Sequence, residues 1–234
     1  MVRKIYEKAF GVLMQKPFRL WGISLLSGLL TFIAGIAFGP IIACTFVATT
    51  LLGVGMQMIY LNTYRTELQP KAAFLFAAFK KEKILKVAGG MAWSALWIFL
   101  WGLIPVVGVI FAIIRAYEYR FVPYILMTRD DVSATDAIKV SKEETMGYKG
   151  KMFGADILVY ALFAAAMIVL GLLGKIPVVG VLFAIICVLL AIVFVLLVPL
   201  FLGLVQAAFY VEIKSAQTAE AVAEAPAEPE APAE

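Results

Sequence analysis

Residues 104–114 read IPVVGVIFAII and residues 176–186 read IPVVGVLFAII, which agree at ten of eleven positions. Each copy joins two apolar stretches and carries the proline and glycine that are typical of a chain reversal. We interpret the two copies as the turns of two related helical hairpins, a kind of repeat that is common in transport folds. A third turn of the same kind is predicted near residue 39. The turn residues in this interpretation are Gly39, Pro40, Pro105, Gly108, Pro177 and Gly180.

The composition points to a bilayer as the solvent of these hairpins. Hydrophobic residues make up 63% of the 234-residue chain and charged residues only 15%, which is outside the balance of soluble globular proteins. A helix needs about 20 mostly apolar residues to cross a hydrocarbon core of about 30 Å. The sequence therefore predicts an all-α membrane protein with six transmembrane helices in three hairpins, at about residues 20–38, 41–61, 87–101, 107–127, 153–173 and 178–198. Pro199 is expected to kink the last span or to begin a separate interfacial segment.

A polar, basic segment precedes each hairpin, at residues 3–19, 69–86 and 133–151. We interpret these segments as amphipathic helices that lie on the membrane surface, although ordinary solvated loops remain an alternative. In the first, Ile5, Ala9, Val12 and Leu13 form an apolar flank. In the third, Ser133 and Asp136 have the spacing of a capping box. The side chains expected to contact lipid headgroups are Lys4, Lys8, Lys80, Lys81, Lys83 and Lys86.

The distribution of basic residues predicts the orientation. The three polar segments, counted together with Arg65 and Arg129 just before the second and third, carry sixteen Lys and Arg residues, whereas the opposite side carries only Lys175. Short loops rich in Lys and Arg stay in the cytoplasm, so both termini are predicted to be cytoplasmic in a bacterial inner membrane. The integral domain then comprises residues 1–214, in units of about 1–63, 64–129 and 130–214.

The C-terminal segment from Ser215 to Glu234 has a different composition. It contains five glutamates, no basic residue and hardly any bulky apolar residue, so it is expected to be disordered. An alternative is that it binds a basic partner or the protein's own lysine clusters.

Several function classes are disfavoured by what the sequence lacks. The chain has no histidine, and its two cysteines, Cys44 and Cys187, lie in apolar runs. No metal site or cofactor is expected from this pattern, and no Walker, dinucleotide, nucleophile-elbow or HExxH motif occurs. The basic residues flank apolar spans rather than forming a nucleic-acid module. We therefore expect a protein that is not an enzyme, binds no nucleic acid and has membrane lipids, especially anionic ones, as partners.

The fourth predicted span contains the most unusual charges, in the stretch Arg115-Ala-Tyr-Glu-Tyr-Arg120. Counted along a continuous helix from residue 107, Arg115 and Glu118 lie near the bilayer midplane, where charges are costly and usually face other helices or water. Arg115, Glu118 and Tyr119 share a helical face, whereas Arg120 points nearly the opposite way, toward the cytoplasmic headgroups. The cluster of these four residues either lines a polar cavity that binds a charged group or is a neutralised pair that holds helices together.

Two further features are weaker. Trp93, Trp97 and Trp101 form a stripe on one helical face, for which packing or anchorage at the membrane surface is the favoured interpretation. Asp156 is placed near a membrane boundary, where a carboxylate can stay hydrated.

Short motifs along the chain resemble a known family, namely bacterial six-pass membrane proteins of unknown function that are related to the membrane domain of glycerophosphoryl diester phosphodiesterases. The motifs are Tyr64-Arg65, Phe74-Leu75-Phe76, Phe79-Lys80, the RFVPYI stretch at 120–125, Asp130-Asp131, residues 137–141 and the MGYKG stretch at 146–150. The resemblance implies a six-pass fold. The phosphodiesterase activity belongs to a separate soluble domain that this chain lacks, so the resemblance implies no catalytic residue.

Two functions are therefore expected from the sequence. The first is a non-enzymatic inner-membrane protein that acts through lipid or protein contacts, or through self-association, in an accessory or protective role in the envelope. The alternative is a small permease or channel for a charged solute or peptide, with Arg115 and Glu118 along its path.

Overall fold

The computed structural model describes residues 1–224 apart from residues 16, 40, 106 and 177–179. Over these residues the chain is helical and contains no strand. The elements in chain order are α1 (Val2–Gln15), α2 (Pro17–Phe38), α3 (Ile42–Thr66), the 3-10 helix η1 (Ala72–Phe79), α4 (Lys81–Gly102), α5 (Val107–Glu118), α6 (Val122–Thr128), α7 (Asp136–Glu144), α8 (Lys149–Leu173) and α9 (Gly180–Glu224).

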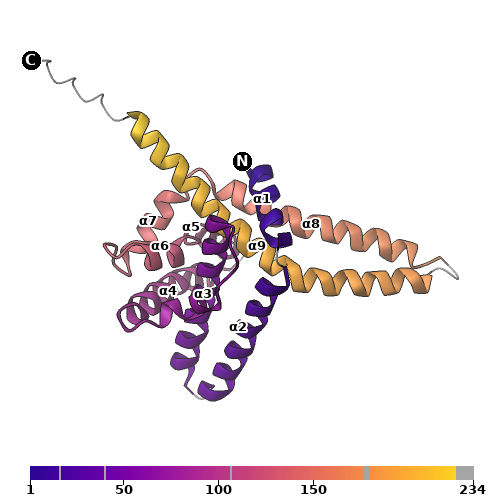
Figure 1. Cartoon of the computed structure of the whole chain (residues 1–234), viewed down its shortest axis with the longest axis horizontal. Coiled ribbons are helices and arrows are strands. Elements are labelled where there is room, and N and C mark those ends of the chain that lie inside the picture. Colours follow the sequence, from indigo (N-terminus) through magenta and orange to yellow (C-terminus); the bar gives the residue numbers. More distant parts are fainter. Residues whose placement is uncertain (16, 40, 106, 177–179, 225–234) are drawn as a thin grey trace, which may run out of the picture.

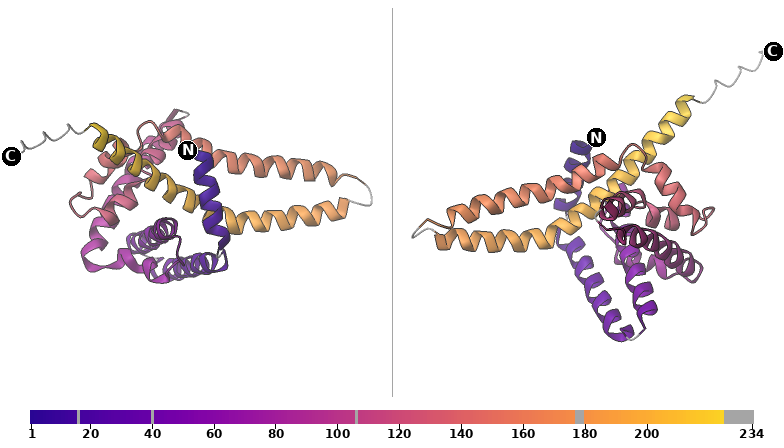
Figure 2. Two further views of the ribbon diagram at one scale, coloured as in Figure 1. Left: turned by 45° about the horizontal axis from the view of Figure 1, so that its top comes forward. Right: turned by 180° about the vertical axis from the view of Figure 1, so that it is seen from behind.

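The helices form a central body from which two long hairpins project. One arm is α2 with the first half of α3, and the other is most of α8 with the first half of α9 (Figure 1). The two arms leave the body in different directions, and the view from behind shows the same separation (Figure 2). The body contains α1, η1, α4, α5, α6, α7 and the ends of the longer helices of the arms (Figure 1).

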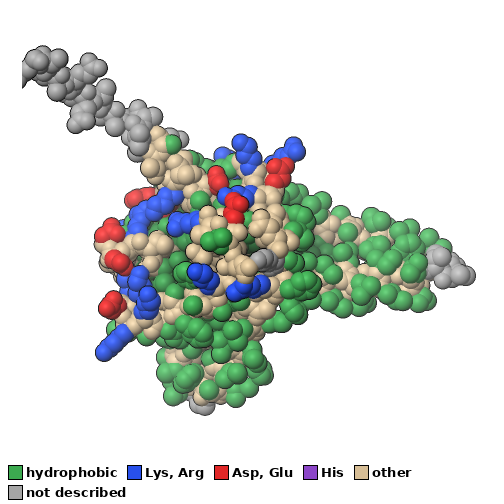
Figure 3. Space-filling model, viewed as in Figure 1, with side chains coloured by type: hydrophobic (Ala, Val, Ile, Leu, Met, Phe, Trp, Pro, Cys, Tyr) green, Lys and Arg blue, Asp and Glu red, His purple; other side chains and the backbone are tan. Residues whose placement is uncertain are grey.

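The arms are largely apolar surface that the rest of the protein leaves uncovered, although α2 buries Leu20, Ile23, Ser27 and Ala34. In α8 and α9 the most apolar 18-residue windows have mean hydropathies of 2.4 and 3.6, and none of their residues is buried. Every buried residue that the structure describes in α9 follows Pro199, beginning with Leu200. Figure 3 shows the arms covered with hydrophobic side chains, while the charged side chains gather on the body. Surface of this kind is stable in lipid and not in water.

Within the described part of the chain, five helices are long and apolar enough to cross a membrane, namely α2, α3, α4, α8 and α9. The prediction of one continuous helix over residues 107–127 was wrong, because α5 ends at Glu118 and α6 begins at Val122. The 12 residues of α5 extend about 18 Å at 1.5 Å per residue, which is short of a hydrocarbon core of about 30 Å.

The predicted reversals lie between α2 and α3, between α4 and α5, and between α8 and α9. Pro105 lies in the second reversal, whereas Pro40 and Pro177 fall outside the described residues. A β-carbon on Gly108 would overlap the carbonyl of Trp101, and one on Gly180 would overlap the carbonyl of Gly174. Glycine is therefore required at equivalent places of the two sequence copies, since only a residue without a side chain lets the chain return this closely.

The first predicted amphipathic helix exists as α1, but its apolar flank faces protein. The flank is buried, with Ile5, Ala9 and Leu13 each at most 2% exposed, and Tyr6 packs edge to face on Phe201 of α9 at 5.3 Å. The expectation that this flank lies among lipid headgroups was therefore wrong. The second half of α9 offers an apolar surface. Packing on this surface removes the flank of α1 from water more completely than the mixed headgroup region would.

The second predicted surface helix is η1, which packs on α3 rather than lying apart on the membrane. Leu75 and Ala78 of η1 are fully buried. A β-carbon on Gly55 of α3 would overlap the backbone of Leu75. The absence of a side chain at Gly55 thus allows the two backbones to meet.

The chain beyond Ser215 is helical for longer than its composition suggested. Helix α9 continues through residues 215–224, where the sequence predicted disorder, while residues 225–234 lie outside the described part. Alanine and glutamate are good helix formers, and extending an existing helix requires no new nucleation. Pro199 lies within α9, and the helix changes direction between its orange and yellow halves (Figure 1), as a proline inside a helix produces.

Gly55→Ala is expected to destabilise the protein by about 1–3 kcal/mol, the usual cost of an overpacked contact, because η1 must move away from α3. Gly53→Ala is the matched control, since a β-carbon there meets no atom within 4 Å and alanine favours the helix. Thermal unfolding in detergent, followed by circular dichroism, measures both variants. Equal melting temperatures for the two variants would contradict the close contact.

Candidate functional site at the break between α5 and α6

The break between α5 and α6 has a local cause in Pro123, the second residue of α6. A proline cannot donate a backbone hydrogen bond, and its ring collides with the carbonyl four residues earlier, which here belongs to Tyr119. That carbonyl instead accepts the N–H of Val122 at 3.1 Å. The helix ends at Glu118 and restarts at Val122, which leaves other backbone groups in need of partners.

Helix α7 supplies the main partner through Ser141, which is fully buried. The Ser141 hydroxyl donates to the carbonyl of Glu118 at 2.6 Å and accepts the N–H of Phe121 at 3.2 Å. Thr145 adds a longer bond to the same Glu118 carbonyl, at 3.4 Å. From α9, Gln206 donates to the carbonyl of Arg120 at 3.2 Å. Side chains from two distant helices thus replace the hydrogen bonds that the break removes.

Glu118 is the centre of an ion triad beside the break. It is only 4% exposed, and one carboxylate oxygen pairs with Arg115 on the same helix. The other oxygen pairs with Lys149, at the start of α8, at 2.6 Å. The structure therefore contains the Arg115–Glu118 pair that the spacing suggested, and it adds Lys149, which sequence reasoning assigned only to a basic surface segment.

Arg120 takes part in a second network, with Asp156 of α8. The guanidinium pairs with the Asp156 carboxylate at 2.6 Å, the Tyr117 hydroxyl donates to the same oxygen at 2.9 Å, and Arg120 also lies over the Tyr117 ring at 5.0 Å. The expectations that Arg120 reaches toward headgroups and that Asp156 stays hydrated were wrong. Both side chains are 14% exposed, because each neutralises the other where α5 meets α8.

The placement of these charges follows from the break. Arg115 and Glu118 were assigned to the midplane by counting along a continuous helix, and that helix does not exist. The triad instead lies where α7 and the first turn of α8 pack, among polar residues. Tyr119 belongs to neither ion network among the described residues and lines a groove together with Arg115.

The lysines expected at lipid headgroups divide into two groups. Lys83 donates to the carbonyl of Met127 at 2.9 Å and Lys86 to that of Arg129 at 2.7 Å, so both satisfy the C-terminal end of α6 rather than facing lipid alone. Lys8 pairs with Glu67 at 3.2 Å. Of these six lysines, Lys4, Lys80 and Lys81 are exposed and have no ion pair among the described residues.

The third predicted surface helix is α7, which begins with the expected capping contact. The hydroxyl of Ser133 accepts the N–H of Asp136 at 3.1 Å. The Asp136 carboxylate accepts hydrogen bonds from Lys139 at 2.9 Å and from the Ser133 hydroxyl at 2.7 Å, and these bonds lower the pKa of the Asp136 carboxyl. One face of α7, which includes Ala137 and Ser141, is buried against the break.

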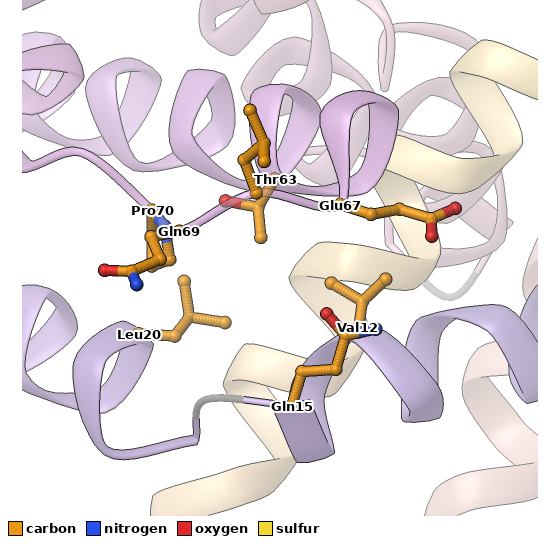
Figure 4. A pocket seen from close by; sticks show the side chains of 8 residues that line it. Val12, Gln15, Leu20, Thr63, Glu67, Gln69 and Pro70 are labelled. Atoms are coloured by element: carbon orange, nitrogen blue, oxygen red, sulfur yellow. The ribbon is translucent and has the colours of Figure 1, made fainter.

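A separate hollow of about 210 Å³ lies between α1, the start of α2 and the loop after α3. The Thr63 hydroxyl in it is buried without a hydrogen-bond partner. Figure 4 shows the carboxylate of Glu67 and the amide of Gln69 pointing away from each other, with Val12 and Leu20 between them. The polar groups do not converge on one point, so this hollow is a weaker candidate than the break.

The chemistry available at the break is limited because each oxygen of Glu118 already contacts a cation. Two polar atoms of the networks, Arg115 Nε and Asp156 Oδ1, are buried without a hydrogen-bond partner among the described residues. Among residues 1–224 with their gaps, no group of three or more Cys, Asp and Glu residues is arranged to hold a metal ion. The arrangement is suited to holding α5, α7 and α8 together.

Ser141→Ala is expected to destabilise the protein by about 1–3 kcal/mol, because the N–H of Phe121 loses its acceptor in a buried place. Ser94→Ala is the control, since Ser94 is also buried but bonds only the Met91 carbonyl of its own helix. Hydrogen–deuterium exchange of peptides covering residues 115–124 should accelerate in Ser141→Ala alone. Unchanged exchange there would contradict the role of Ser141.

Glu118→Gln is expected to destabilise the protein by about 2–4 kcal/mol, because it leaves two cations without a counter-charge. Arg115 and Lys149 are partly exposed, which keeps this cost near or below the range for fully buried pairs. Glu7→Gln removes a carboxylate from an exposed pair with Arg3 and should have little effect. Chemical unfolding in detergent compares the two. A Glu118→Gln protein as stable as Glu7→Gln would show that the triad does not hold the helices.

No protein-family model, curated protein or solved structure matches this chain. What the protein does is therefore inferred from its own residues and their arrangement.

Proposed function

We propose that this protein is a non-enzymatic integral protein of a bacterial inner membrane that acts through contacts with lipids and other membrane proteins, in an accessory or protective role in the envelope. The observation that carries the proposal is the pair of bare apolar arms. From Ile157 to Leu173, α8 offers about 25 Å of helix without a buried residue, close to the thickness of a hydrocarbon core. A surface that the protein leaves uncovered is available to lipid, to a partner or to a second copy of the chain.

We further propose that the α2/α3 and α8/α9 arms, which leave the body in different directions in Figure 1, turn to a common direction in a bilayer and cross it, and that the α4/α5 hairpin lies at its cytoplasmic surface. Helix α5 is too short to cross, and the lysines of α7 lie beside the second half of α4. This arrangement has two crossing hairpins, instead of the three expected from the resemblance to six-pass membrane proteins. Both versions place the N- and C-termini in the cytoplasm, which the strong bias of basic residues supports.

The alternative of a small permease rests on the charges at Arg115 and Glu118. Both oxygens of Glu118 are occupied by cations, and the two ion networks pair three basic residues with two carboxylates. A passing solute would have to displace Lys149 or Arg115 from Glu118. The pairing therefore supports the lipid- and partner-binding function over transport.

Single cysteines in a Cys44→Ser/Cys187→Ser protein are expected to report this topology. In spheroplasts, a membrane-impermeant maleimide should label Lys175→Cys at the tip of the α8/α9 arm. It should label Glu7→Cys only after permeabilisation.

Leu103→Cys, at the exposed reversal between α4 and α5, distinguishes the two arrangements. We expect no labelling from outside, because this hairpin stays on the cytoplasmic side. External labelling of Leu103→Cys would instead support three crossing hairpins, and release of the protein by alkaline carbonate would contradict an integral membrane protein altogether.

A further inference from the structure

A groove of about 380 Å³ runs between α4 and α7, beside the break but on the other face of α7. One wall is a stripe on α4 formed by Trp93, Trp97 and Trp101, which are spaced four residues apart and so share a helical face. The opposite wall comes from α7, with Lys139 and Lys142 three residues apart. The rest of the lining is Arg115 of α5, Tyr119, Thr135 and Ile138.

The groove carries an excess of positive charge. Arg115, Lys139 and Lys142 line it, and Lys149 shares Glu118 with Arg115. The carboxylates that contact these cations are Glu118 and Asp136. Four cations against two carboxylates leave two positive charges uncompensated. Lys142 has no ion pair among the described residues, so its ammonium is available to an anion.

The tryptophan wall is open and amphipathic. Trp93 and Trp97 are 38% and 39% exposed and form an edge-to-face pair at 5.8 Å, and Arg115 lies over the Trp101 ring at 5.3 Å. Indole rings combine an apolar face with one N–H donor, which makes tryptophan common at the level of lipid headgroups. Cations and indoles together suit a ligand that is anionic at one end and apolar at the other.

We propose that this groove binds an anionic membrane phospholipid, with its phosphate between Arg115, Lys139 and Lys142 and its glycerol and first acyl carbons along the tryptophan stripe. The proposal rests on the function proposed above and names its lipid class and its site. Basic pockets beside membrane helices on the cytoplasmic side are typical sites for anionic headgroups.

The apolar surface next to the groove favours a phospholipid over a soluble phosphate compound. Leu96 and Leu100 are 44% and 42% exposed and, by their spacing, follow the tryptophan stripe along α4. An acyl chain covers such surface and gains from its removal from water, whereas a soluble phosphate compound gains nothing from it. Charge and apolar contact thus select the same class of molecule.

Binding in the groove would also act on the break, because α7 has two functional faces. Lys139 and Lys142 face the groove, while Ser141 faces the break and holds Glu118 and Phe121. A phospholipid that holds the lysines keeps α7 in place over the break. Bound lipid should therefore slow hydrogen exchange at residues 115–124 as well as in α7.

The test uses the full chain in a neutral detergent, titrated with phosphatidylglycerol and with phosphatidylcholine of the same acyl chains, and followed by native mass spectrometry. We expect clear preference for phosphatidylglycerol. In Lys139→Gln/Lys142→Gln its affinity should fall about thirtyfold, from the contribution of two lysines near an anionic lipid surface. Lys71→Gln/Lys151→Gln, which removes the same charge at exposed positions that do not line the groove, should keep the wild-type affinity.

Three further results would each decide part of the proposal. Trp97→Leu should weaken phosphatidylglycerol binding while melting temperature shows that the fold persists, which would support the aromatic wall. Equal losses in the two lysine double variants would show diffuse attraction and overturn the groove as the site. Displacement of the lipid by an equal concentration of glycerol 3-phosphate would overturn a phospholipid as the ligand.

The two proposals fail in distinguishable ways. If the cysteine labelling shows insertion but Lys139→Gln/Lys142→Gln binds phosphatidylglycerol like the wild type, the groove assignment fails and the membrane function stands. If carbonate releases the protein, the membrane function itself fails.

Discussion

The hydrogen bonds of Ser141 are the interaction on which the body of this protein depends. Pro123 prevents α5 and α6 from forming one helix, so backbone groups of Glu118 and Phe121 need other partners in a place without water. A single hydroxyl both donates to one and accepts from the other. Because an unpaired buried backbone group is costly, α7 must lie over the break, and the chain on either side of α7 is constrained with it.

The charge networks follow from that placement. Once α7 lies on the break, the chain continues directly into α8, whose first turns carry Lys149 and Asp156. Lys149 then meets Glu118, and Asp156 meets Arg120 and Tyr117. Each charge is neutralised by a residue from another helix, which is how charges in a poorly hydrated setting are tolerated. The body therefore pairs its buried charges, whereas the arms carry apolar side chains that need no partner in lipid.

Pro123 and Pro199, each of which follows a valine, show how context decides the effect of a proline. Pro123 ends a helix, whereas Pro199 lies inside α9, which continues to Glu224. At the first, Ser141, Thr145 and Gln206 supply replacement hydrogen bonds, so a full break is stable. Helix α7 then presents its other face, with Lys139 and Lys142, toward the tryptophans of α4, which links the packing of the body to the proposed lipid site.

The sequence by itself determined what depends on local pattern and composition: helices rather than strands, the apolar arms, the three reversals, the amphipathic α1 and the Arg115–Glu118 pair three residues apart. These features follow from helical periodicity, from glycine and proline, and from the lipid-like composition. Only the tertiary structure decided that residues 107–127 form two helices, that Lys149 and Asp156 join Glu118 and Arg120, and that α7 divides its faces between the break and the groove. Those outcomes depend on which side chains from distant segments reach an unpaired backbone group or an unpaired charge. Residue spacing in the sequence does not say which distant segments come into contact.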